Sequence, residues 1–150
     1  MLKVIGLGNE LRGDDGIGPH IIKKLNDIDR TVPLQLVNAG SDAFIILDYL
    51  RSKERMLLID CANVNKKPGT VSLIDLNETT LAQLDQLISL HGFGFAEMYR
   101  MAQSLGQVAP CKVIAVQPKT IEFGQELSPE VQQAVPHIIK LVIEEANKDA

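Results

Sequence analysis

The N-terminal segment constrains the fold more than any other part of the sequence. A short apolar run, residues 2–7 (LKVIGL), is followed by a glycine-rich stretch, and apolar residues then recur at the spacing of a helix face: Ile17, Ile21, Ile22 and Leu25. This pattern predicts a strand, a loop and an amphipathic helix. A βα unit of this kind is the usual opening of a sheet covered by helices.

The same alternation continues through the chain. Further strands are expected at residues 34–37, 56–59, 71–76 and 111–116. Further helices are expected after Ser41 as N-cap, carrying Phe44, Ile45, Leu47 and Leu50, and at residues 80–88 and 95–105. A last helix is expected after Ser128 and Pro129 as N-cap and first helical residue. The run at 56–59 is almost wholly apolar, as in a strand covered on both faces. The strand at 71–76 is predicted to be antiparallel because the preceding connection is too short for a crossover helix. The predicted fold class is therefore α/β, a three-layer sandwich with a twisted, mostly parallel sheet and helices on both faces.

Length and composition set further limits. The 150 residues, 45% of them hydrophobic, fit one domain spanning residues 1–150. A net charge of -4 argues against a nucleic-acid partner, since phosphate binding depends on clustered Lys and Arg. The N-terminal apolar run is too short for a secretion signal and no segment is long enough to cross a membrane, so we expect a cytoplasmic protein with no membrane partner. Cys61 and Cys111 form no C-x-x-C motif and are expected to be reduced, partly buried strand residues.

The loop at residues 6–18, GLGNELRGDDGIG, begins like a nucleotide-binding loop. Gly6 and Gly8 fit a G-x-G-x-x-G fingerprint, but Leu11 occupies its third small position. Asp14 and Asp15 would also stand where the helix N-terminus should meet a phosphate, which a carboxylate repels. Either Asp could instead cap the helix, although one cap explains only one of them.

Two more polar residues are candidates for the same site as the acids of this loop. Ligands in α/β sheets bind beyond the carboxyl ends of the strands, so residues just after Leu7, Ile59 and Val116 are the first candidates. Asp60 closes the most apolar strand, and His91 lies in the glycine-flanked segment SLHGFGFAE. Two carboxylates and an imidazole suit a divalent metal of intermediate softness, such as nickel or zinc, and leave positions open for substrate. His20 is expected to be peripheral, because it lies five residues past Asp15 and the two do not share a helix face.

Four segments together resemble the hydrogenase maturation endopeptidases, which trim the C-terminus of the large subunit of nickel-iron hydrogenases. They are GLGNELRGDDGIG, LLIDCANVNKKPGTV, SLHGFGFAEMYRMAQSLG and VIAVQPKTIEFGQELSPEVQQAVP, and the similarity extends over nearly the whole chain. The resemblance implies a phosphorylase/hydrolase-like fold. It also implies an endopeptidase of aspartic or metal type, in which Asp15, Asp60 and His91 form both the metal-contacting and the catalytic set.

The resemblance carries expectations about the metal and the partner. Nickel would arrive already inserted in the large-subunit precursor and serve for recognition, and zinc or cadmium would substitute in vitro. Gly16 and Gly18 would let the substrate backbone approach closely. Asn38 stands where many family members carry Asp, so an acid-base role at this position is open, as is the identity of the general base. A monomer is expected.

Two alternatives belong to other classes. Peptidyl-tRNA hydrolases also open with a strand and GLGN, but they continue with a different motif and typically carry a basic tRNA surface; salt-sensitive tRNA binding would support this alternative. A non-enzymatic nickel chaperone could use the same three ligands. Tight nickel binding without proteolysis of any precursor would favour the chaperone.

Overall fold

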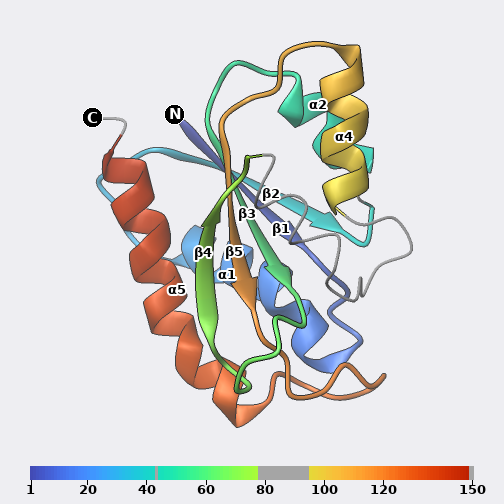
Figure 1. Cartoon of the computed structure of the whole chain (residues 1–150). Coiled ribbons are helices and arrows are strands. Elements are labelled where there is room, and N and C mark those ends of the chain that lie inside the picture. The colour runs from blue at the N-terminus through green and yellow to red at the C-terminus, as the bar shows by residue number, and fades with distance from the viewer. Residues whose placement is uncertain (43, 78–94, 149–150) are drawn as a thin grey trace.

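A computed structural model describes residues 1–42, 44–77 and 95–148, which contain a five-stranded sheet with helices on both of its faces (Figure 1). The strand order is β2-β1-β3-β5-β4. The strands are β1 (Leu2–Leu7), β2 (Leu34–Gly40), β3 (Met56–Cys61), β4 (Val71–Asp75) and β5 (Cys111–Val116). The helices are the short 3-10 turn η1 (Gly13–Gly16), α1 (Ile17–Asp27), α2 (Phe44–Leu50), α4 (Phe95–Leu105) and α5 (Pro129–Asn147).

Alternation along the strands divides the core between two helical layers. Leu2 and Val4 of β1 pack with residues of α1 and α5, whereas Ile5 and Leu7 pack with residues of α2 and α4. β3 is the middle strand, buried from both sides and paired in parallel with β1 and β5. The central strands therefore end at one common edge, which we call the carboxyl edge.

The described elements confirm the α/β class and most of the predicted order. β3 is central and β4 pairs antiparallel with β5, as the short connection required. Ser128 caps α5, accepting a hydrogen bond from Val131 N–H, and Pro129 follows it as the first helical residue. β2 continues three residues beyond its predicted end at Val37, to Gly40. The predicted helix at 80–88 lies outside the described residues.

The remaining expectations concern the cysteines, the number of domains and membrane-spanning segments. Cys61 and Cys111 are free strand residues, as predicted, but both are buried where partial burial was expected. The prediction of a single domain over residues 1–150 stays a prediction. Among the described residues, no helix combines the length and apolar character that crossing a bilayer requires.

Candidate functional site

Asp15 lies at the carboxyl edge, inside a loop that closes on itself. Its Oδ2 accepts a hydrogen bond of 3.0 Å from the backbone N–H of Asn9, directly after β1. Its own N–H donates to the carbonyl of Arg12, and Arg12 N–H donates to the carbonyl of Asn9. Asp15 is fully buried. The loop therefore fixes this carboxylate relative to the end of β1.

Glycines allow this loop and the following helix to lie against the strands. A Cβ on Gly18 would stand 2.5 Å from the carbonyl oxygen of Leu7 and 2.7 Å from that of Ile59, both in the backbone of the sheet. Gly8 has a φ of 139°, and a Cβ there would meet the carbonyl of Asp15. A Cβ on Gly16 would meet Glu10 Cα at 3.0 Å. The expectation that Gly18 admits the substrate backbone is therefore wrong, because Gly18 is buried against the protein's own sheet, whereas the same expectation for Gly16 stays a prediction.

Asp60 reaches the same edge from β3. Its neighbour Cys61 packs in the core cluster of α1 and α5, so alternation directs Asp60 to the opposite face, that of α2 and α4. Burial raises the pKa of the Cys61 thiol, and the charges of Asp60, Asp15 and Asp14 raise it further. Asp60 and Asp15 thus both act on one buried sulfur atom. The raised pKa disfavours the thiolate, so Cys61 is poorly suited to act as a nucleophile.

His91, the third predicted ligand, lies outside the described residues. Within the parts of the chain that are described, no three His, Cys, Asp or Glu side chains are grouped to hold a metal ion. The structure therefore brings Asp15 and Asp60 to one edge, and the three-residue metal site stays a prediction.

Asp14 has a different role from Asp15. Its Oδ2 accepts hydrogen bonds from the N–H groups of Lys119 (2.8 Å) and Thr120 (3.2 Å), and its Oδ1 accepts one from Ser128 N–H (2.7 Å). Ser128 Oγ also donates to Oδ2 at 2.8 Å. Asp14 does not cap α1, since Gly16 holds that position. It fastens the β5–α5 segment to the loop after β1.

Gln117, directly after β5, stabilises the carboxyl edge next to β3. It follows β5, is buried, and its Oε1 accepts hydrogen bonds from the N–H groups of Val64 (2.7 Å) and Lys66 (3.4 Å). It thereby holds the segment that leaves β3. Sequence analysis pointed to the position after Val116 as part of the edge but did not identify this role. A polar residue directly after an apolar strand was the available signal.

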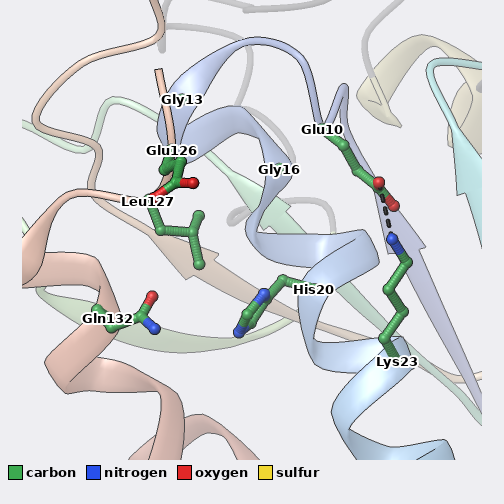
Figure 2. Close-up of a pocket in the computed structure, with 8 residues that line it drawn as sticks. All are labelled: Glu10, Gly13, Gly16, His20, Lys23, Glu126, Leu127 and Gln132. Carbon is green, nitrogen blue, oxygen red and sulfur yellow. Dashed lines mark hydrogen bonds and ion pairs between the residues drawn. The ribbon is translucent and has the colours of Figure 1, made fainter. Parts of the chain in front are cut away.

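A pocket of about 360 Å³ lies between the start of α1 and the start of α5 (Figure 2). Its lining is mostly polar and comprises Glu10, Gly13, Gly16, His20, Lys23, Glu126, Leu127 and Gln132. Glu10 and Lys23 form an ion pair of 2.8 Å. Burial lowers the pKa of His20, the charges of Lys24 and Lys23 lower it further, and Glu10 opposes them. His20 is thus a neutral imidazole near pH 7, in a pocket whose lining includes neither Asp15 nor Asp60.

Asn38 is exposed at the carboxyl end of β2. Its Oδ1 accepts a hydrogen bond of 3.0 Å from the N–H of Gly40, two residues on. An amide side chain therefore shapes the end of this strand, beside β1.

Comparisons with known proteins agree on one family. The family model described as hydrogenase maturation protease, HycI, matches residues 19–145. The hydrogenase expression/formation protein HupD of Thiocapsa roseopersicina is 26% identical over 94% of this chain, which spans 65% of that protein. The coenzyme F420 hydrogenase subunit delta of Methanothermobacter thermautotrophicus is 27% identical, with 95% of this chain and 92% of that protein covered.

Solved structures give the same result. The hydrogenase maturating endopeptidase HybD of Escherichia coli superposes with a TM-score of 0.86 at 21% identity, covering 99% of this chain and 93% of that one. A hydrogenase 2 maturation peptidase from a Thaumarchaeota archaeon is 27% identical with a TM-score of 0.73, and 97% of each chain is covered. The fold, the residues matched by the family model and the sequence relatives lead to one conclusion: the chain belongs to the hydrogenase maturation protease family.

Proposed function

We propose that the protein is an endopeptidase that removes the C-terminal extension of a nickel-iron hydrogenase large-subunit precursor after nickel insertion. Asp15, Asp60 and His91 would complete the coordination of the nickel that the precursor carries. The observation that supports the proposal is that two acids stand at the carboxyl edge on neighbouring parallel strands, Asp60 near the end of β3 and Asp15 in the loop bound to the end of β1. Family membership supplies the substrate class.

The position of α4 supports the inclusion of His91. Asp60 is directed to the face that α2 and α4 cover, and α4 returns the chain from the carboxyl edge to the start of β5 (Figure 1). In the sequence His91 stands four residues before Phe95, the first residue of this helix.

Carboxylates at this edge suit the reaction in two ways. Carboxylate oxygens and an imidazole nitrogen are good ligands for a divalent ion of the nickel type. A carboxylate can also accept a proton from the attacking water while the water oxygen adds to the scissile carbonyl carbon; the carbon–nitrogen bond then breaks and the amine leaves with a proton. Asp15 and Asp60 are the two candidates for this base.

The test compares nickel-loaded and nickel-free precursor with wild type, Asp15→Asn, Asp60→Asn and His91→Ala, with cleavage followed by mass spectrometry of the released extension. We expect only nickel-loaded precursor to be cut, and each variant to lose at least about 100-fold in rate. Asp29→Asn is the matched control, because Asp29 is exposed between α1 and β2, away from the carboxyl edge. Equal cleavage by all proteins would refute the proposal.

A second measurement separates the alternatives. Tight nickel binding by the isolated protein with no cleavage of any precursor would favour a nickel chaperone. The family match gives no support to a peptidyl-tRNA hydrolase. Action in the cytoplasm, a monomeric state, and replacement of nickel by zinc or cadmium in vitro stay predictions.

A further inference from the structure

Two large apolar side chains are exposed at the carboxyl edge beside the loop that holds Asp15. Leu11 is 69% exposed and Phe123 is 71% exposed, the two highest values among the large apolar residues described. The first lies in the loop after β1 and the second in the segment between β5 and α5, and the two segments run close together (Figure 1). Exposed apolar groups on a monomer are common singly, but a pair on neighbouring loops beside a candidate active site is characteristic of a contact surface.

The two loops are fixed to one another. The N–H of Gly124 donates to the carbonyl of Leu11 at 2.9 Å, and the N–H of Gly13 donates to the carbonyl of Gln125 at 3.0 Å. Beneath them, buried Asp14 accepts the hydrogen bonds from Lys119, Thr120 and Ser128 described above. The apolar pair is thus held in place before a partner arrives, which lowers the entropy cost of binding.

Arg12 gives this surface a charge. Its guanidinium carbon lies 5.3 Å from the centre of the Phe123 ring, in cation–π contact. Within the described residues it makes no ion pair, and its buried Nε has no hydrogen-bond partner. Only Nε of this half-buried side chain is a buried atom without a partner, so the outer guanidinium nitrogens are open to a partner carboxylate while apolar groups of the partner cover Leu11 and Phe123.

We infer that Leu11, Arg12 and Phe123 form a docking surface for the precursor, engaging an apolar segment that also presents a carboxylate. This inference rests on the proposed function, because it places the precursor segment beside the residues that would meet its nickel. Leu11 and Arg12 belong to the closed loop whose Asp15 binds Asn9, so contact here would bring the bound segment to the candidate site. Phe, Leu and Arg side chains on a fixed surface are suited to carry much of the binding energy of a protein contact.

The test measures precursor binding and cleavage separately. For the double variant Leu11→Ser/Phe123→Ser and for Arg12→Glu, we expect KM and the directly measured precursor Kd to rise about tenfold or more, while kcat stays within about twofold. Leu105→Ser is the matched control, because Leu105 is 56% exposed but ends α4 at the opposite edge of the sheet. The melting temperatures of the double variant and of Leu105→Ser should match wild type, since the changed side chains are exposed. Arg12 is half-buried, so the folded state of Arg12→Glu is checked separately by circular dichroism.

The outcomes are distinguishable. If wild type cleaves the precursor and the double variant binds it equally well, the docking surface is refuted while the proposed function stands. If wild type binds without cleaving, the proposed function fails, and the variants' Kd values alone decide the docking surface. A fall in kcat with unchanged Kd and KM, or a wild-type dimer that the double variant abolishes, would also overturn the inference.

Discussion

Asp14 and Asp15 show how far residue type alone can predict a role. The sequence offered two acids near a helix start, and capping was a reasonable interpretation of either. In the structure Asp14 accepts hydrogen bonds from a segment more than 100 positions away, as its bond to Lys119 shows, while Asp15 fixes the loop beside it. The candidacy of Asp15 followed from local sequence. The role of Asp14 depends on a long-range contact that no local pattern encodes.

Loss of the Asp14 carboxylate should destabilise the protein. In wild type the two carboxylate oxygens of Asp14 accept all the hydrogen bonds from Lys119, Thr120 and Ser128. In Asp14→Asn one of these oxygens becomes an amide NH2 group, which cannot accept, so at least one donor loses its acceptor. Each buried donor left without an acceptor costs about 1–3 kcal/mol, so we expect a loss of about 3 kcal/mol in the free energy of unfolding. Urea denaturation measures it, with Asp29→Asn as the control for the same chemical change at an exposed site. A loss below about 1 kcal/mol would show that the interpretation of Asp14 is wrong.

At the scale of elements, the pattern of apolar residues predicted the strands and most helices closely. β1, α4 and β5 have the predicted bounds, because their apolar residues repeat with a clear period and turn residues flank them. The closeness of α1 to the sheet was not predicted. The fingerprint lacked its third glycine at position 11, whereas in the structure Gly18, seven residues later, provides the close contact between helix and strands.

Gly18→Ala tests this contact between α1 and the sheet. Alanine would gain about 1 kcal/mol of helix propensity. Its Cβ would, however, lie 2.5 Å from one backbone oxygen and 2.7 Å from another, so the helix must shift away from β1 and β3. We expect a net loss of at least about 2 kcal/mol in unfolding free energy by denaturant titration. The exposed Asn26→Ala in the same helix should be neutral or stabilising. An unchanged or raised stability in Gly18→Ala would contradict the close-packing account.

At the scale of the whole molecule, the two edges of the sheet hold different polar groups. The carboxyl edge carries Asp15 and Asp60. Near the other edge, Glu145 of α5 is 2% exposed and accepts contacts from Lys148 (2.8 Å), Lys112 (3.0 Å) and Arg55 (3.4 Å). This buried network was not predicted, because its members are distant in sequence and each alone is typical of a helix or strand end. It ties α5 to β5 and to the start of β3.

We therefore expect Glu145→Gln to lower the stability of the protein without changing its cleavage activity. Burial raises the pKa of Glu145, but hydrogen bonds and charges from Lys148 and Lys112 outweigh it and leave the pKa below its ordinary value of 4.5. A folded-state pKa below the unfolded value means that the charged carboxylate stabilises the protein above pH 4.5, and that this stabilisation is lost as the pH falls through the folded-state pKa.

At pH 7 we expect Glu145→Gln to lose about 2 kcal/mol of unfolding free energy. This is less than the roughly 3–5 kcal/mol expected for a fully buried pair, because the three cations keep contact with water. The difference from wild type should shrink toward pH 3, measured by urea titration at each pH. Glu144→Gln, which removes an exposed pair with Lys140, should show little change at either pH. Because the network lies away from Asp15 and Asp60, precursor cleavage by folded Glu145→Gln should keep the wild-type KM and kcat; a large fall in kcat would mean that the two edges of the sheet are coupled.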